Sequence, residues 1–197
     1  MNNNKINLAI FASHGGSNAQ ALIDACKADY FPAKVSFVLT NNSNANVINR
    51  AKESNIPVII LNKTHVAEPL EEFCVNALKQ HKVDLILLAG YMKKIPSILI
   101  KEFENRILNI HPALLPKFGG KGMFGMNVHK AVIESKEEFS GASIHLVTEN
   151  YDEGPILAQE KVKILERDTA ESLQKKVLAV EHQLYKDTVK KYITENF

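Results

Sequence analysis

The chain has 197 residues, enough for one domain that buries roughly two thirds of the surface exposed by its unfolded form. Its composition, 45% hydrophobic and 23% charged without low-complexity segments, excludes disordered and fibrous proteins. The net charge is only +2 and Lys and Glu are interspersed, so we expect no nucleic-acid partner. Since no apolar run approaches the ~20 residues of a membrane span, we expect no membrane partner either.

The first half of the chain alternates short apolar runs with amphipathic helical patterns. Strands are predicted at residues 6–12, 35–40, 57–61 and 84–90. Helices are predicted at residues 19–27, 45–54, 68–80 and 97–103. Continuous apolar strands separated by helices are typical of a parallel sheet covered on both faces. We therefore expect an α/β fold, with a doubly wound, mostly parallel sheet and helices on both faces.

The second half departs from this alternation. The sequence predicts a strand at 106–110, a helix at 127–135, and two further strands at 142–148 and 156–164. The last two strands are joined by a segment containing Asp-Glu-Gly-Pro, which favours a turn over a crossover helix. We therefore expect an antiparallel C-terminal strand pair. The final helix carries an apolar stripe that should pack on the sheet, and no linker or repeat divides the chain.

The two cysteines, Cys26 and Cys74, lie far apart inside helical patterns, which excludes a disulfide framework and a zinc-binding spacing. The N-terminal stretch MNNNKINLAIFAS lacks the apolar core and the cleavage site of a secretory signal. Both features predict a protein of the reducing cytoplasm.

The loop after the first strand reads His-Gly-Gly-Ser-Asn and precedes a helix. Glycines let backbone N–H groups turn toward a ligand, and a helix N-terminus favours an anion, most often a phosphate. The alternative is a tight turn in which Ser17 or Asn18 caps the helix. A dinucleotide fingerprint is disfavoured, because Gly-x-Gly-x-x-Gly is absent and Asn41-Asn42, rather than an acid, ends the second strand.

A strand that ends in Asn109-Ile110-His111-Pro112 carries the clearest chemical signal. Residues two apart on a strand face the same way, so the amide and the imidazole should project together at a strand's carboxyl end. Such a pair suits a carbonyl oxygen that becomes negative in a transition state. The alternative is a capping asparagine beside a histidine that the backbone satisfies.

Asp152 lies in the turn seven residues after His145. A loop aspartate usually forms a turn with nearby backbone. A carboxylate beside Asn109 and His111 would instead supply a proton acceptor that also holds an imidazolium.

The motifs GGSN, LAGYM, ILNIHPALLPKF and ASIHLVTENYDEGP occur in this order over nearly the whole chain. Together they resemble the folate-dependent formyltransferases, and the early GGSN and the compact length favour the phosphoribosylglycinamide formyltransferase family. The resemblance implies one formyltransferase domain over residues 1–197, with a nucleotide-phosphate half at about 1–105 and a folate and catalytic half at about 106–197. It implies transfer of a formyl group from 10-formyltetrahydrofolate, a co-substrate, to the amine of glycinamide ribonucleotide in purine biosynthesis, without a metal.

By this resemblance, Asn109 and His111 stabilise the tetrahedral oxyanion, while Asp152 keeps His111 charged and accepts the proton lost by the amine. Substrate binding is assigned to Gly16, Ser17, Asn18 and Glu181. Folate binding is assigned to Met92, Lys93, Lys94, Ile95, Val147, Thr148, Glu149 and Asn150. The Gly-rich segment 119–126 differs from many relatives and is expected to form a flap, from which Lys121 or His129 reaches the substrate.

Two related enzymes remain as alternatives, methionyl-tRNA formyltransferase and formyltetrahydrofolate deformylase. The first usually carries a further tRNA-binding domain and the second an N-terminal regulatory domain, and neither is expected in this sequence. A nucleotide-binding regulatory domain without chemistry is a third alternative, against which the intact Asn, His and Asp argue. We expect a monomer or a weak homodimer.

Overall fold

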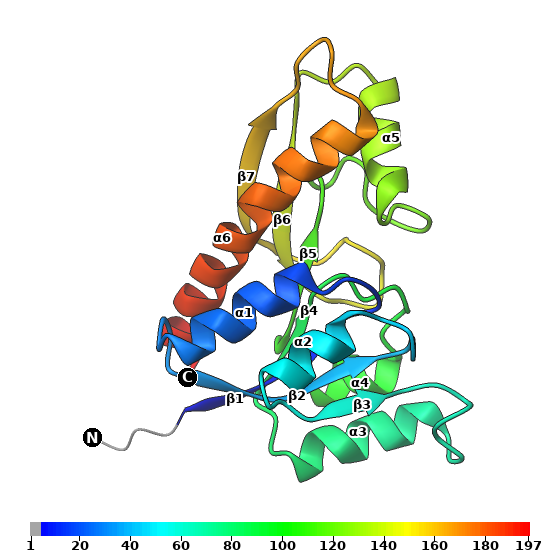
Figure 1. The fold of residues 1–197 in the computed structure, drawn as a ribbon, viewed down its shortest axis with the longest axis vertical. Helices are drawn as coiled ribbons and strands as arrows, with labels where there is room; N and C mark the ends of the chain where they lie inside the picture. Colours follow the sequence, from blue (N-terminus) through cyan, green and yellow to red (C-terminus); the bar gives the residue numbers. More distant parts are fainter. Residues whose placement is uncertain (1–4) are drawn as a thin grey trace.

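The computed structural model describes residues 5–197, in which seven strands form one sheet in the order β3-β2-β1-β4-β5-β6-β7 (Figure 1). The strands are β1 (Ile6–Phe11), β2 (Ala33–Thr40), β3 (Val58–Ile60), β4 (Leu85–Leu88), β5 (Ile107–His111), β6 (Phe139–Leu146) and β7 (Ile156–Lys163). Neighbours from β3 to β5 pair in parallel, whereas β5, β6 and β7 pair antiparallel. The predicted fold class is confirmed, including the antiparallel C-terminal pair.

Helices flank this sheet (Figure 1). They are α1 (Ser17–Lys27), α2 (Val47–Glu53), α3 (Leu70–Gln80), α4 (Ser97–Glu102), α5 (Met126–Glu134) and α6 (Ala170–Asn196). The predicted elements are present with their ends shifted by a few residues. No helix within residues 5–197 is long and apolar enough to cross a membrane.

The strand β1 shows how one apolar run serves two cores, because successive side chains point to opposite faces of a sheet. Leu8 and Ile10 pack with α1, α2 and α6 on one face. Ala9 and Phe11 pack with α3 and α4 on the other. The continuous apolar character of this strand therefore follows from burial on both faces.

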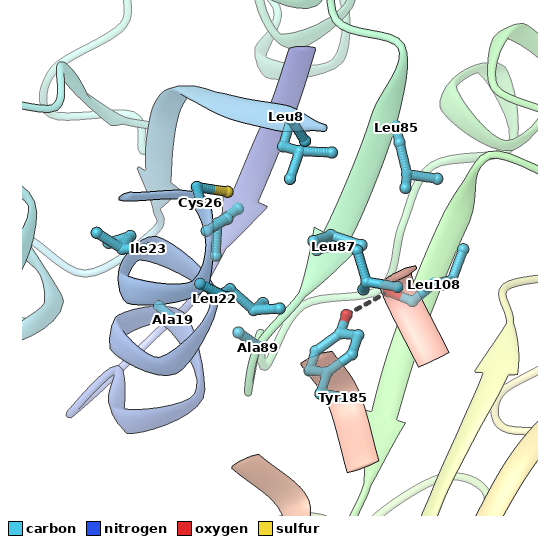
Figure 2. Packing of buried hydrophobic residues seen from close by; sticks show 14 of the residues in the cluster. Leu8, Ala19, Leu22, Ile23, Cys26, Leu85, Leu87, Ala89, Leu108 and Tyr185 are labelled. Atoms are coloured by element: carbon cyan, nitrogen blue, oxygen red, sulfur yellow. Dashed lines mark hydrogen bonds between the residues drawn. The ribbon is translucent and has the colours of Figure 1, made fainter. Parts of the chain in front are cut away.

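Tyr185 of α6 fixes the longest helix against the sheet. Its hydroxyl lies 3.1 Å from the carbonyl oxygens of both Leu88, the last residue of β4, and Leu108 in β5. Figure 2 shows this side chain on the same face as Leu22 of α1 and Leu87 of β4. Glu181 lies one helical turn before Tyr185, so this anchor also brings Glu181 toward the carboxyl ends of the strands.

The chain changes direction across the sheet between β1 and β4, since β2 and β3 lie on one side of this pair and β5 on the other. Open α/β sheets bind ligands outside the carboxyl ends of strands at such a point. Here the segments after β1 and β4 lead to α1 and α4, which pack on opposite faces of the sheet. A ligand-binding cavity is therefore expected at this position.

Candidate active site

A cavity of about 430 Å³ lies at this point of the sheet. It is lined by every residue to which the sequence assigned catalysis or binding: Asn109, His111, Asp152, Gly16, Ser17, Asn18, Glu181, Met92, Lys93, Lys94, Ile95, Val147, Thr148, Glu149 and Asn150. The structure thus brings together segments that are distant in sequence. Apart from Glu181 of α6, they form three groups, which we name after the roles expected from the sequence: the acceptor loop (residues 14–18), the donor walls (92–95 and 147–150) and the catalytic centre (Asn109, His111 and Asp152).

The acceptor loop turns its carbonyl groups away from the cavity. The carbonyl oxygen of His14 accepts the N–H of Val47, 3.1 Å away, and that of Gly15 accepts Nε of Arg50 at 2.8 Å. Gly16 has φ +71°, and a Cβ there would approach Val47 to 2.5 Å, so only glycine fits. These two carbonyl groups are held by residues of α2, and α1 begins at Ser17. The loop is therefore able to offer its N–H groups to an anion.

Asn18 and Glu181 join the acceptor loop to α6. Asn18 Nδ2 donates to Glu181 Oε2 over 2.7 Å, while Asn18 Oδ1 is buried without a hydrogen-bond partner. Burial raises the pKa of the Glu181 carboxyl, and the bond from Asn18 opposes this shift. Buried polar groups that line a cavity and lack full bonding are suited to a ligand's hydroxyl or amine groups.

Asp152 lies where three polar groups from β5 and β6 meet. Its carboxylate is 3.4 Å from Asn109 Nδ2, 3.5 Å from His111 Nδ1 and 3.4 Å from His145 Nε2. The N–H of Gly120 also donates to it over 2.9 Å. Burial by itself would raise the pKa of Asp152, but the hydrogen bond with His145, the nearby His111 and the Gly120 N–H together lower it. Asp152 is therefore a carboxylate at neutral pH.

Asn109 and His111 face this carboxylate because of the way β5 ends. Leu88 pairs with Asn109 and β4 stops there, so β5 continues past its parallel neighbour. The two side chains lie two residues apart and share a face of the strand, as the sequence predicted. They therefore meet Asp152 at the edge of the cavity.

His111 differs from the expectation that Asp152 keeps it charged. The residue is only 4% exposed, and burial lowers its pKa below the ordinary 6.5, although Asp152 and the carbonyl of Phe118 favour the charged form. The expectation was wrong for the resting protein because it counted the carboxylate and not the loss of solvation. His111 Nε2 donates to the Phe118 carbonyl oxygen at 2.8 Å, which leaves Nδ1 toward Asp152.

His145 is the residue that the sequence analysis left without a role. It pairs directly opposite Asn109 across the antiparallel β5–β6 ladder, and its Nε2 lies 3.0 Å from Asn109 Nδ2. Its Nδ1 donates to the carbonyl of Leu146 at 2.8 Å, which directs Nε2 toward both the amide of Asn109 and the carboxylate of Asp152. His145 therefore holds its ring beside the Asn109 amide, at the point where this amide meets Asp152.

The donor walls both line the cavity and contact each other through neighbouring side chains. Lys94 lies over the ring of Tyr151, with 5.9 Å between its Nζ and the ring centroid. Ser97, just after the first wall, donates to Glu149 Oε2 over 2.6 Å. These contacts hold residues 92–95 and 147–150 beside each other in the lining of one cavity.

Residues 120–125 of the Gly-rich segment and His129 line the same cavity, and their contact with a substrate stays a prediction. Gly120, Gly122 and Gly125 have positive φ angles, and a Cβ on Gly125 would lie 3.9 Å from the end of Met92. The segment thus spans from the catalytic centre to a donor wall. His129 is 3% exposed, and burial lowers its pKa to about 4, so its imidazole is neutral at neutral pH.

The family model for formyl transferases matches residues 6–189. The chain belongs to the formyl transferase family. The chloroplastic phosphoribosylglycinamide formyltransferase of Vigna unguiculata is 48% identical over 184 residues, which cover 92% of this chain and 59% of that protein. This chain therefore spans about three fifths of that relative's length.

Two further relatives match over most of their own length. The phosphoribosylglycinamide formyltransferase of Haemophilus influenzae is 36% identical over 95% of this chain and 87% of that protein. The solved structure of the Bacillus halodurans enzyme of the same name is 40% identical, covers 97% of each chain and superposes with a TM-score of 0.88. The catalytic centre thus lies in a formyl transferase fold.

Proposed function

We propose that this protein transfers the formyl group of 10-formyltetrahydrofolate to the amine of glycinamide ribonucleotide, a step of purine biosynthesis. The observation that carries the proposal is the meeting of Asn109, His111 and Asp152 at a cavity between an anion-type loop and a second slot. The relatives named phosphoribosylglycinamide formyltransferase support this choice of acceptor.

The nucleotide is proposed to bind along the acceptor loop and α6. Its phosphate would meet the N–H groups of Gly16, Ser17 and Asn18, where the helix dipole of α1 adds positive charge. Its ribose or amine would donate hydrogen bonds to Glu181. The hydrogen bond between Asn18 and Glu181 holds the acceptor loop at a fixed distance from α6.

The folate is proposed to bind between the donor walls. Main-chain groups of residues 92–95 and 147–150 would read the polar edge of its pterin. The formyl carbon would then lie beside Asn109, next to the acceptor amine, so that both reactants are held together before any bond forms.

The amine nitrogen attacks the formyl carbon, whose carbonyl oxygen becomes an oxyanion. Asn109 Nδ2 is suited to this oxygen, because its 3.4 Å contact with Asp152 is long and easily exchanged. The new negative charge raises the proton affinity of His111, so the imidazole becomes charged by taking over, through Asp152, the proton that the attacking nitrogen loses. An interaction that strengthens only at this stage accelerates the reaction.

Collapse of the intermediate breaks the bond between the formyl carbon and N10 of the folate. Over the whole reaction the attacking nitrogen loses a proton and N10 gains one, which the imidazolium of His111 releases as the oxyanion charge disappears. Asp152, ionised at neutral pH, is the proposed acceptor of the first proton, directly or through water. These reaction steps need no covalent enzyme intermediate, and the absence of a metal from the reaction stays a prediction.

The decisive experiment mixes the purified protein with glycinamide ribonucleotide and 10-formyltetrahydrofolate and follows the absorbance of the deformylated folate. Rapid transfer that requires the nucleotide supports the proposal. Equal rates with water alone would support the deformylase, and transfer only to methionyl-tRNA would support the tRNA enzyme. Either result would overturn the assignment.

The cellular compartment, the division into two halves and the oligomeric state belong to the same proposal. Cys26 and Cys74 are both unpaired and buried, which supports a reducing compartment such as the cytoplasm. The division into a nucleotide-phosphate half and a folate and catalytic half near residue 105 stays a proposal in outline only, because residues of both halves line the cavity. A monomer or weak homodimer stays a prediction that sedimentation would test.

A further inference from the structure

Ser13 lies between the end of β1 and the acceptor loop and is 1% exposed. Its hydroxyl donates to Asn41 Oδ1 over 2.5 Å and accepts the backbone N–H of Met92 over 2.8 Å. Its own N–H donates to the carbonyl of Gly90 at 3.1 Å, and its carbonyl accepts Nδ2 of Asn42 at 3.2 Å. Every polar group of this one small residue is therefore bonded.

These bonds join the carboxyl ends of three neighbouring strands. Asn41 and Asn42 follow β2, Gly90 and Met92 follow β4, and Ser13 itself follows β1. The junction lies at the point where the sheet changes direction. It also lies between two ligand-binding segments, because the acceptor loop begins at the next residue and the first donor wall begins at Met92.

We propose that Ser13 is a positioning residue that holds the first donor wall at a fixed place relative to the acceptor loop, and so sets the approach of the formyl carbon to the amine. This inference rests on the proposed formyl transfer. Small displacements of bound reactants are costly, since an error of about 1 Å is able to reduce a rate by ~10²-fold. A buried hydroxyl that donates and accepts at once limits such displacement.

The contacts predict an asymmetric effect when the hydroxyl is removed. Met92 N–H would lose its partner, and the wall would shift or take up water. The acceptor loop would keep its bonds to α2, namely Val47 N–H to the carbonyl of His14 and Arg50 Nε to that of Gly15. Binding of the folate should therefore suffer more than binding of the nucleotide.

The test is Ser13→Ala, with KM measured separately for both substrates. We expect the KM for 10-formyltetrahydrofolate to rise roughly tenfold and kcat to fall, while the KM for glycinamide ribonucleotide changes less than about twofold. Ser13→Thr, which keeps the hydroxyl, should restore much of the folate KM. The matched control is Ser140→Ala, since Ser140 is 2% exposed on β6, lies outside the cavity and has an unpartnered hydroxyl.

A second measurement does not depend on activity. Amide hydrogen exchange at Met92, followed by NMR, should be faster in Ser13→Ala than in the unmodified protein and unchanged in Ser140→Ala. Unchanged exchange at Met92 would overturn the positioning role whatever the protein catalyses. Faster exchange with an unaltered folate KM, or with equal increases in both KM values, would also overturn it. Absence of transfer by the unmodified protein would instead overturn the proposed function.

Discussion

Replacement of Asp152 by asparagine tests the catalytic centre most directly. The change keeps the size of the side chain but removes a charge that lies 3.5 Å from His111 Nδ1. At an effective dielectric constant of about 20, a full charge on His111 would be stabilised by about 5 kcal/mol at this distance. A neutral amide would recover ~1 to 2 kcal/mol of this through hydrogen bonding.

The loss of about 3 kcal/mol in the transition state corresponds to a rate reduction of ~10²-fold. The amide also cannot accept the proton that leaves the attacking nitrogen, and loss of a general base typically removes a further ~10²-fold or more. We therefore expect kcat of Asp152→Asn to fall by ~10⁴-fold. Both substrates should still bind, because Asp152 is not the main group that holds either one.

The assay is single-turnover transfer, with ligand binding measured separately by calorimetry. Asp84→Asn is the matched control, because Asp84 accepts the backbone N–H of Asn7 at 2.8 Å and lies at the amino end of β4, away from the cavity. A rate within tenfold of the unmodified protein for Asp152→Asn would refute the proposed proton acceptor. Loss of binding in place of loss of rate would refute the division between catalysis and binding.

Three other changes test separate parts of the molecule. His145→Ala should lower kcat by ~10-fold or more with little change in either KM, since the Asn109 amide loses its 3.0 Å partner; an unchanged kcat would rule out this orienting role. Ser17→Asp should raise the KM for glycinamide ribonucleotide far more than that for the folate through charge repulsion, and equal increases would count against an anion site in the acceptor loop. The pKa of buried His129 is about 4 instead of 6.5, so the histidine of the unfolded chain takes up a proton at a higher pH than that of the folded protein. The free energy of unfolding should therefore fall by about 3 kcal/mol as the pH drops from about 6.5 to 4. Urea unfolding of His129→Leu should show a weaker loss over this range, and an identical pH dependence would contradict the assignment.

Local sequence patterns predicted most of the fold because burial on both faces leaves a strong signal. The strand β4 is apolar throughout, and Gly90 follows it within the predicted boundary. The shared face of Asn109 and His111 followed from the period of a strand alone. The arrival of Asp152 beside them did not, since it depends on the path of a turn after β6, and only the family resemblance indicated it.

His145 shows which kind of information the sequence lacks. Its contact with Asn109 depends on the register between β5 and β6, and a long segment containing α5 separates these two strands. A short hairpin fixes register through its turn, whereas a long connection leaves it to tertiary packing. The sequence offered one signal, a histidine in a predicted strand of a sheet that carries a candidate active site. This signal did not reveal that Asn109 is its partner.

The charge of His111 was predicted wrongly for the same reason that the role of His145 was missed. Both depend on packing, which the sequence does not show directly. The carboxylate of Asp152 is visible in the sequence and favours an imidazolium, but the burial that opposes it arises from the whole cavity wall. A histidine that is neutral at rest, with a carboxylate at one nitrogen and a carbonyl at the other, is already prepared to hold a proton. In the proposed reaction the proton becomes favourable only when negative charge appears nearby, so burial would make the interaction specific to the transition state instead of weakening the site.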